Sequence, residues 1–308
     1  MNIFFMGTPD FSVPSLELFV KNYNVLGVFT QPPRPSGRGM NKVKSPIHNF
    51  SERHDLNLFT PDSLKNKKYI NILQKLKPDL VVVVAYGLIV PELILNIPKY
   101  GCINGHASLL PKWRGAAPIQ RAIEAGEKKT GCTTMLMESG LDTGPMIYKK
   151  EVNIKKNDDV IDLYKKLSKI TAECLDKTIK MLICGKINYQ NQNNSVATYA
   201  HKLNKNEGLI TWDLSAVQIH NKMRAFKYFP GTFFYYNQNK INIIDGIPIE
   251  KNHNEKPGTI ITLSDKILIA CNENTIFQIN MLQKAGKNKM SVKDFLNGNN
   301  LKIGEKLD

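Results

Sequence analysis

The sequence predicts an α/β protein, in which a mostly parallel sheet covered by helices is followed by a smaller β-barrel domain. Three observations predict this architecture. Residues 1–185 alternate apolar strand-like runs with helical patterns, residues 185–200 are polar and rich in Asn, and the rest of the chain carries short strand-like runs separated by Gly, Asn and Asp. A length of 308 residues is enough for two domains, each with its own core.

The first part of the chain supplies the predicted sheet and its helices. We expect strands at residues 3–6, 25–30, 80–85, 102–104 and 133–137. Helices are expected at residues 13–22, 70–77, 118–125 and 160–183. Pro118 suits the first turn of its helix, and Gly126 suits the end of it. Residues 160–183 carry apolar side chains at spacings of mostly three and four, so this helix is expected to pack on the core.

The second part of the chain supplies the predicted barrel. We expect one helix at residues 215–226, followed by strands at residues 231–236, 240–246, 258–263, 266–271 and 276–282. The polar stretch before them reads as a linker across the surface. The predicted boundaries are therefore a first domain at 1–188, a linker at 189–204 and a second domain at 205–308.

Composition and charge limit the class of protein. No apolar run approaches the roughly 20 residues that span a bilayer, and the first residues carry no basic leader but an acid at Asp10, so we expect a cytoplasmic protein without a membrane anchor. The five cysteines form no CxxC pair and are expected to be reduced and buried. The net charge of +15 is compatible with a nucleic-acid partner. From Glu17 to Glu52 no acid interrupts the chain, whereas several basic residues crowd one Pro/Gly-rich loop, at Arg34, Arg38, Lys42 and Lys44.

Polar residues that follow predicted strands are the candidate site, because ligands of open parallel sheets bind at the carboxyl ends of the strands. Asn104 and His106 end one strand and share a face, since residues two apart in an extended segment point the same way. Both can donate to a developing oxyanion. Asp142, between Gly140 and Gly144, is the candidate partner of His106. Considered singly, a histidine of this kind is more often structural and "GLDTG" more often a turn.

Other chemistries find no support in the sequence. Ser108 lies near His106, but there is no GxSxG elbow for a nucleophilic serine. "GTPDF" stands where a dinucleotide-binding protein would carry GxGxxG, so NAD is disfavoured. The chain has no phosphate-binding Walker loop, and its His and Cys residues lack zinc spacing, so we expect no metal.

Seven stretches resemble the methionyl-tRNA formyltransferase family. They are "GTPDF", "FTQPPRPSGRG", "VVVAYGLIVP", "INGHASLLPKWRGAAPIQRAI", "SGLDTGPMIY", "ATYAHKLNKNEGLITWDLSA" and "AGKNKMSVKDFLNG". The resemblance spans nearly the whole chain, and its most specific part is "SLLPKWRGAAPIQ". It implies a Rossmann-like formyltransferase domain, an OB-like barrel, and transfer of the formyl group of 10-formyltetrahydrofolate to the amine of methionine on initiator methionyl-tRNA, for translation initiation. The transfer would be direct, through a tetrahedral oxyanion.

The resemblance also implies roles for particular residues. Asn104 and His106 would donate to the oxyanion and Asp142 would pair with His106, so that each replacement is expected to cost on the order of 100- to 1000-fold in rate. A folate-binding role follows for two segments, Ser108, Leu109, Leu110 and Pro111, and Tyr86, Gly87 and Leu88. A tRNA-binding role follows for the basic loop, above all Arg38, and for lysines of the second domain, Lys284, Lys287 and Lys289. A monomer is expected.

Four positions depart from the family pattern, and other functions stay open. Gly105 stands where a β-branched residue is common, Ala107 where glycine is, Pro33 where an acid is, and Phe229 where tryptophan is. A formyltransferase acting on a small amine would not need the basic loop or a second domain. A hydrolase would use water in place of the amine. A non-catalytic RNA-binding protein would not need Asn104, His106 and Asp142 together.

Overall fold

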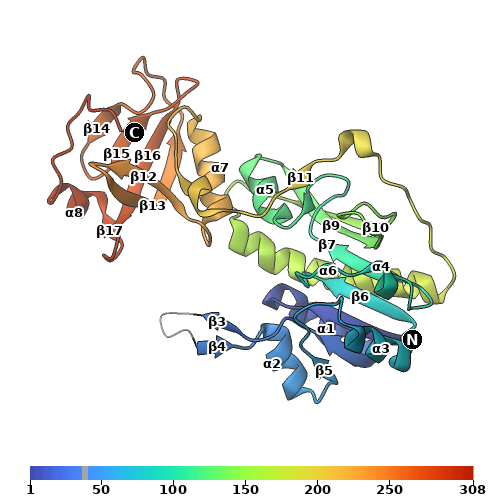
Figure 1. Ribbon diagram of the computed structural model, residues 1–308. Helices are drawn as coiled ribbons and strands as arrows, with labels where there is room; N and C mark the ends of the chain where they lie inside the picture. Colours follow the sequence, from blue (N-terminus) through green and yellow to red (C-terminus); the bar gives the residue numbers. More distant parts are fainter. Residues whose placement is uncertain (37–40, 308) are drawn as a thin grey trace. The chain divides into compact units, whose positions relative to one another are not determined.

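The chain folds into two compact units (Figure 1). The computed structural model describes residues 1–36 and 41–307. Unit 1 is formed by Met1–Pro118, Lys129–Asn153 and Leu163–Ala200, and unit 2 by Ile119–Lys128, Ile154–Asp162 and His201–Asp308. Unit 2 therefore takes two short segments from the first 162 residues in addition to the C-terminal part of the chain.

Unit 1 is built on a mostly parallel sheet, as the sequence predicts, but the sheet has seven strands where five were expected. In spatial order the strands are β10 (Met146–Asn153), β9 (Lys129–Leu136), β7 (Cys102–His106), β6 (Leu80–Val84), β1 (Asn2–Gly7), β2 (Asn24–Phe29) and β5 (Leu58–Phe59). The five strands from β7 to β5 run parallel, whereas β9 is antiparallel to β7 and β10 is antiparallel to β9. The largest differences from the expected strand ends are that β7 continues to His106 and that β9 begins at Lys129, whereas the other ends differ by one residue at most.

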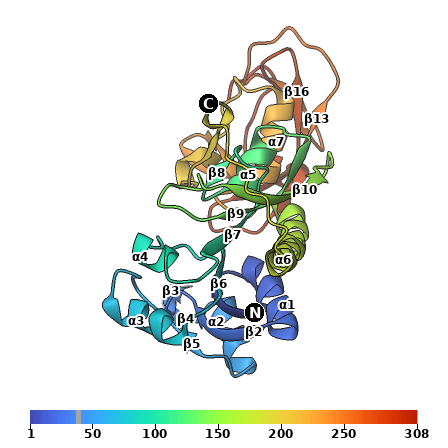
Figure 2. The same ribbon diagram turned by 90° about the vertical axis from the view of Figure 1, so that its right-hand side faces the viewer.

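Helices cover both faces of this sheet. In unit 1 they are α1 (Val13–Asn22), preceded by the short 3-10 turn η1 (Asp10–Ser12), α2 (Pro46–Arg53), α3 (Lys67–Leu76), α4 (Glu92–Leu95) and, from Leu163 onward, α6 (Val160–Ile183). The helix α5 (Pro118–Glu124) belongs to unit 2 except for its first residue. Figure 2 shows α1 and α6 on one face and α3 and α4 on the other. Successive strand residues serve opposite faces: Phe4 packs in the core beneath α3 and α4, and Phe5 meets Phe19 of α1 edge to face at 6.0 Å.

Two small pairs of strands complete unit 1. Residues 34–44, expected to be a loop, include an antiparallel pair, β3 (Arg34–Ser36) with β4 (Asn41–Val43). The expectation of a loop was wrong. Pro and Gly are typical of loops, and the two short strands lack the alternating apolar side chains that predict a strand. The second pair joins β8 (Arg114–Gly115) in parallel to β11 (Tyr199–Ala200). The segment that the sequence suggests as a linker thus contributes a strand, and also the 3-10 turn η2 (Asn194–Val196).

Unit 2 is centred on an antiparallel sheet with a separate core. Its strands are, in spatial order, β12 (Thr232–Tyr236), β13 (Asn239–Ile249), β16 (Ile276–Lys284), β15 (Ile267–Ala270) and β14 (Ile260–Leu263), with β17 (Met290–Ser291) paired to β16. The helical elements are η3 (Lys205–Gly208), α7 (Ala216–Phe226) and α8 (Val292–Leu296). Trp212, Phe234 and Phe277 are buried in this core. Closure of the sheet into an OB-like barrel stays a prediction.

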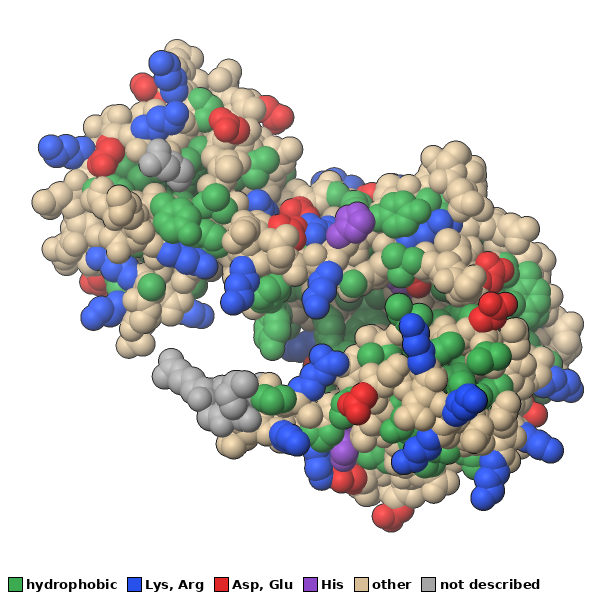
Figure 3. All heavy atoms as spheres, in the orientation of Figure 1, with side chains coloured by type: hydrophobic (Ala, Val, Ile, Leu, Met, Phe, Trp, Pro, Cys, Tyr) green, Lys and Arg blue, Asp and Glu red, His purple; other side chains and the backbone are tan. Residues whose placement is uncertain are grey.

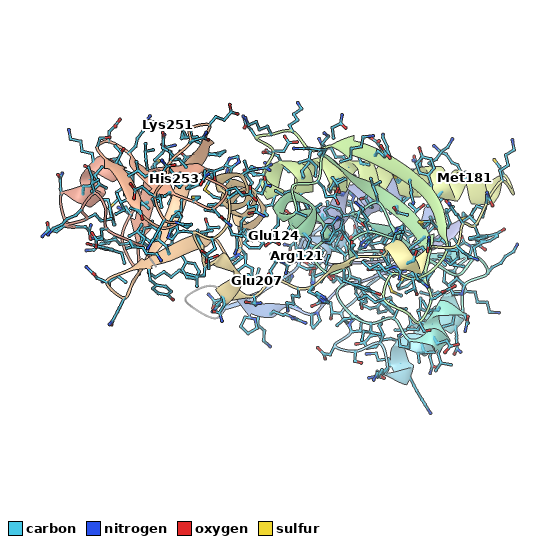
Figure 4. All side chains as sticks on the ribbon, turned by 90° about the horizontal axis from the view of Figure 1, so that it is seen from above. Arg121, Glu124, Met181, Glu207, Lys251 and His253 are labelled. Carbon is cyan, nitrogen blue, oxygen red and sulfur yellow. The ribbon has the colours of Figure 1, made fainter. Side chains whose placement is uncertain are left out.

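Ion pairs link the three stretches of unit 2. Arg121 of α5 pairs with Glu124 at 2.8 Å and with Glu207 of η3 at 2.6 Å, and the three side chains lie together in Figure 4. Although burial acts to raise the pKa of Glu207, its bond to Arg121 holds it below the usual value. Lys227, which follows α7, pairs with Asp159 at 2.6 Å. The inserted segments are thereby fixed to the C-terminal part of the unit.

Two further sequence expectations can be checked in the described residues. Cys184 is exposed, so the expectation that all five cysteines are buried was wrong at this position. It lies just after the last turn of α6, where the apolar stripe of the helix has ended. Among residues 1–36 and 41–307, no helix is both long enough and apolar enough to cross a membrane.

Candidate active site

Strand β7 brings Asn104 and His106 to the same face of the sheet, at its carboxyl end. The residue between them points the opposite way: a Cβ on Gly105 would lie 2.6 Å from Cγ2 of Thr171 and 3.0 Å from Cδ1 of Leu175, both on α6. The helix therefore occupies the space that a β-branched side chain would need, which accounts for this departure from the family pattern. Asn104 is partly buried and His106 is 6% exposed.

Asp142 reaches this pair from the connection between β9 and β10. Asp142 follows the strand expected at residues 133–137, whose carboxyl end would lie beside that of β7 if the two strands were parallel. Because β9 is antiparallel to β7, Leu136 at its carboxyl end pairs with Ile103 at the start of β7 rather than with His106. The connection then returns along β7, so that Oδ2 of Asp142 lies 3.6 Å from Nδ1 of His106, and Nδ2 of Asn104 donates to Oδ1 at 3.4 Å.

Backbone groups hold the two ends of the His106–Asp142 pair. The amide of Gly115 donates to Oδ2 of Asp142 at 2.8 Å. Nε2 of His106 lies 2.9 Å from the carbonyl oxygen of Trp113. Since a carbonyl only accepts, Nε2 carries a proton and donates it there. Nδ1 is then the ring nitrogen that faces the carboxylate.

Two of these groups lie in strained backbone. Trp113 has a φ of 63° and Asp142 a φ of 52°, both in the left-handed region that non-glycine residues seldom adopt. Residues held in this way cluster at functional sites, where the surrounding structure fixes them. The structure thus brings together all three of the sequence-predicted catalytic candidates.

The predicted folate segment Ser108–Pro111 leaves β7 directly after His106. Ser108 Oγ donates to the carbonyl of Lys112 at 2.6 Å, and Thr133 Oγ1 both donates to the Ser108 carbonyl at 2.8 Å and accepts from the Leu110 amide at 3.1 Å. The side chain of Leu110 is buried among methionines of β9 and β10. The side chains of Ser108 and Leu110 are therefore used within the fold, whereas Leu109 and Pro111 are partly exposed and can meet a ligand.

The second predicted folate segment, Tyr86–Leu88, follows the neighbouring strand β6. Its carbonyl at Tyr86 accepts hydrogen bonds from Thr8 Oγ1 at 2.7 Å and Gln31 Nε2 at 2.9 Å. The ring of Tyr86 is buried in the core, and burial raises the pKa of its hydroxyl. Leu88 is partly buried, and the next residue, Ile89, is 87% exposed. This segment can therefore offer a ligand its backbone and an apolar side chain, but not the Tyr86 ring.

The described residues of the segment 34–44 that are predicted to bind tRNA are exposed but not equivalent. Arg34 and Lys42 lie on the β3–β4 pair, and Lys44 follows it. The expectation of an unbalanced basic loop was wrong at Lys44, because Nζ pairs with both carboxylate oxygens of Glu52 at 2.7 and 2.8 Å, eight residues along the chain on α2. Arg38 lies outside the described residues. Pro33, before the pair, is partly buried.

In unit 2, Lys287 lines a surface groove of about 250 Å³ with Lys240 and Lys284, and Lys289 is exposed nearby in sequence. Phe229 is 42% exposed, so it presents an aromatic surface as a tryptophan would. Lys and Arg side chains are spread over the visible faces of both units (Figure 3). In the described part of the chain, no group of three or more His, Cys, Asp and Glu side chains is arranged to hold a metal ion.

Sequence reasoning missed four residues around Asp142. They are Trp113, Arg114, Gly115 and Gln192. The first three form the stretch "WRG". Its glycine is the signal that the sequence offers, because position 115 has a φ of 119° and a Cβ there would lie 2.8 Å from the carbonyl oxygen of Ala200, so that glycine suits it. Gln192 stands in a polar stretch that resembles any surface segment, and nothing in the sequence distinguishes it.

Comparison with known proteins places these features in context. A family model described as "Formyl transferase" matches residues 1–179, and one described as "Formyl transferase, C-terminal domain" matches residues 202–300. The chain is 43% identical over 306 residues to a methionyl-tRNA formyltransferase of Caldanaerobacter subterraneus subsp. tengcongensis, covering 99% of each chain. It is 40% identical over 301 residues to one of Rickettsia rickettsii, covering 98% of each.

Solved structures share the fold at lower identity. The sugar 3N-formyltransferase WlaRD, solved in the presence of dTDP and 5-N-formyl-THF, matches with a TM-score of 0.66 at 22% identity, over 94% of this chain and 99% of that one. An N-formyltransferase of Helicobacter canadensis, in complex with folinic acid and dTDP-3-aminofucose, matches with a TM-score of 0.67 at 21% identity, over 92% and 98%. At this level of identity the likeness establishes the fold.

Proposed function

The chain belongs to the methionyl-tRNA formyltransferase family, and from this we propose that it transfers a formyl group from 10-formyltetrahydrofolate to the amino group of methionine on initiator methionyl-tRNA. The observation that carries the proposal is the joining of Asn104, His106 and Asp142 at the end of β7, in a chain 40–44% identical to relatives of that name over nearly its full length. Formylmethionyl-tRNA is the product, and tetrahydrofolate leaves.

The residues beside the catalytic cluster fit a folate. A pterin ring is flat, carries hydrogen-bonding groups at its edge and needs apolar contacts on its faces. The segments after β6 and β7, which are neighbouring strands, supply backbone groups together with the accessible apolar side chains of Leu88, Ile89 and Leu109. We assign the folate to Tyr86–Leu88 and Ser108–Pro111. When bound, it supplies an activated formyl group whose carbon accepts the amine.

The catalytic roles follow from which atoms are free. Asn104 Nδ2 has a second N–H besides the one directed at Asp142, and we assign it to the oxyanion that develops on the formyl oxygen. The Nε2–H of His106 donates to the carbonyl oxygen of Trp113, so it can donate to the oxyanion only when that hydrogen bond is broken. Nδ1 and Asp142 Oδ2, which lie 3.6 Å apart, are left as the pair that takes the proton from the amine and returns it to the leaving nitrogen.

Basic residues of the segment 34–44 and of unit 2 are assigned to tRNA. Arg34, Arg38 and Lys42 would approach the acceptor end, and Lys287 would contact phosphates, which position the tRNA without reading its sequence. Because charged initiator tRNA is used at the start of translation, we propose that the protein acts in the cytoplasm. We propose that it acts as a monomer, which light scattering coupled to gel filtration can check.

The decisive experiment compares acceptors. The purified protein is incubated with labelled 10-formyltetrahydrofolate and, in separate reactions, methionyl initiator tRNA, glycinamide ribotide and a dTDP-linked amino sugar. We expect label on the methionine of the tRNA and on neither small amine. Formylation of a small amine alone would overturn the proposal, and release of formate without an acceptor would identify a hydrolase.

A further inference from the structure

The guanidinium of Arg114 is buried inside unit 1, and it donates hydrogen bonds to neutral oxygen atoms. Arg114 is 2% exposed. Its Nε and Nη2 donate to Oε1 of Gln192 at 3.0 and 2.8 Å, and Nη2 also donates to Oδ1 of Asn194 at 2.8 Å. None of the carboxylates in residues 1–36 and 41–307 forms an ion pair with it. A buried cation without a counter-ion lowers stability, and such departures from good packing are typical of functional sites.

The other end of the Gln192 amide holds the turn that carries Asp142. Nε2 donates to the carbonyl oxygens of Asp142 and Gly144, both at 2.8 Å. The guanidinium of Arg114 can only donate hydrogen bonds, so the Gln192 amide must present Oε1 to it. This orientation directs Nε2 of Gln192 toward the two carbonyls. The side chain of Gln192 therefore holds two carbonyl groups of the turn at residues 140–144. Asp142, at the centre of this turn, has a left-handed φ of 52°.

We propose that Gln192 and Arg114 are positioning residues, which hold the backbone of Asp142 so that its carboxylate meets His106. The proposal rests on the proposed function. The carboxylate itself is fixed by the amide of Gly115, the neighbour of Arg114, so the two residues of β8 restrain Asp142 through its side chain and, by way of Gln192, through its backbone. The segment between α6 and unit 2 is thereby part of the active site rather than only a connection.

Gln192→Glu separates positioning from general stability. Glutamate has the same shape and gives Arg114 the carboxylate that it lacks, and this gain opposes the cost of two lost hydrogen bonds in the turn, so we expect a folded variant with a melting temperature close to that of the wild type. The same change removes both N–H donors from the turn and places an oxygen against two carbonyls. We expect kcat to fall about 10- to 100-fold, since small displacements of catalytic groups have effects of this size, while KM for tRNA and for folate stays within about threefold.

Asn194→Ala is the matched control. It removes one acceptor from Arg114 but no bond to the Asp142 turn. We expect it to lower the melting temperature without lowering kcat more than about threefold. Should Gln192→Glu fail to fold, Gln192→Met, of similar length and uncharged, replaces it with the same expected loss of kcat. A Gln192 variant that is folded and keeps kcat within threefold of the wild type, or a loss shared equally by Asn194→Ala, overturns the proposal.

A second readout does not depend on turnover. The Gly115 amide donates to Asp142, so its proton resonance in an NMR spectrum reports the position of the carboxylate. We expect this resonance to shift upfield in Gln192→Glu and to stay in place in Asn194→Ala. If wild-type protein forms no formylmethionyl-tRNA, the proposed function fails, while the Gly115 resonance still tests the positioning role of Gln192. An unmoved resonance in Gln192→Glu rejects that role whatever the activity.

Discussion

Nε2 of His106 lies 2.9 Å from the carbonyl oxygen of Trp113, and this contact determines which ring nitrogen can exchange a proton. The carbonyl fixes the proton on Nε2, so Nδ1 is left facing Asp142. Trp113 can present its carbonyl there because its backbone is left-handed, with a φ of 63°. The histidine and the aspartate are therefore oriented as a pair, from one side by Trp113 and from the other by Gly115.

Asp142→Asn tests the His106–Asp142 pair with a side chain of nearly the same shape. Oδ2 of Asp142 faces both the Gly115 amide and Nδ1 of His106, so an asparagine oxygen placed there keeps the Gly115 bond, while the NH₂ takes the place of Oδ1 beside Nδ2 of Asn104. We expect the variant to fold, with KM values close to those of the wild type. It cannot take part in proton transfer. We expect kcat to fall on the order of 100- to 10,000-fold, the range typical of a lost general base or its carboxylate partner. Steady-state kinetics at saturating folate measure this, and a loss smaller than tenfold would contradict the assigned role.

Gly105→Ala tests the fit between β7 and α6. The new Cβ would lie 2.6 Å from Thr171 Cγ2 and 3.0 Å from Leu175 Cδ1, so strand or helix must shift. We expect the free energy of unfolding of unit 1 to fall by about 1–3 kcal/mol, as overpacking of a core usually causes. Thr171→Ala removes the closer methyl group, so the double variant should recover most of the loss. Urea unfolding of the four proteins gives the coupling, and additive losses would show that the contact is not the cause.

The strands and helices of unit 1 could be predicted because their apolar residues repeat at the required spacing. Residues 13–22 and 160–183 form helices with the predicted bounds, and the buried strand at Leu80–Val84 ends within one residue of expectation. The helix at Pro46–Arg53 was missed although Ser45 and Pro46 signal its start, because its eight residues make only about two turns and include just two large apolar side chains, Ile47 and Phe50. The strand at Met146–Asn153 was missed because it lies at the sheet edge, where polar side chains are exposed.

The candidate site could be predicted only as a set of residue types. Asn104 and His106 share a face because they are two residues apart in a strand, which local geometry dictates. The approach of Asp142 depends on the antiparallel direction of β9, and this is a tertiary property with no local signal. The same holds for Gln192, which is 50 residues from Asp142 in sequence and meets it because β11 pairs with β8. Contacts of this range follow from topology rather than from motif.

His220 of α7 should make unit 2 less stable in acid. Burial, followed by the positive charges of Arg224 and Lys156, lowers its pKa to about 4, against a smaller opposing effect of Asp245. Above the unfolded value of about 6.5 both states are neutral and His220 has no effect. As the pH falls from about 6.5 to about 4, the unfolded state binds a proton that the folded state does not, so stability is lost across that window and the loss then levels off.

The size of the effect is on the order of 2 kcal/mol, after discounting for partial exposure of the ring. Urea unfolding at pH 7 and pH 4.5 measures it. In His220→Gln the titrating group is gone, so its loss of stability between the two pH values should be smaller than that of the wild type by this amount. Carboxylates such as Asp159 also titrate near the lower limit, but they contribute equally to both proteins. Equal losses in the two proteins would show that His220 is not involved.

Lys42 and Lys44 should differ in their effect on tRNA binding. Lys44 is paired with Glu52, so its charge is largely neutralised before tRNA arrives, whereas Lys42 is exposed on β4 and pairs with no acid among the described residues. We expect Lys42→Gln to raise KM for methionyl-tRNA about 3- to 10-fold and Lys44→Gln less than about twofold. Lys42→Gln should also reduce the slope of log binding against log salt by about 0.7–0.9, the effect of one lost phosphate contact.

Glu52→Gln provides the converse test, because it frees Lys44 without changing any basic residue. Its KM for tRNA should fall below that of the wild type, and the salt dependence should steepen as Lys44 gains a phosphate. Lys75→Gln, an exposed lysine on α3, controls for net charge and should change neither quantity. If all three lysine variants weaken binding equally, the interaction depends on total charge, and the β3–β4 pair has no special part in holding the tRNA.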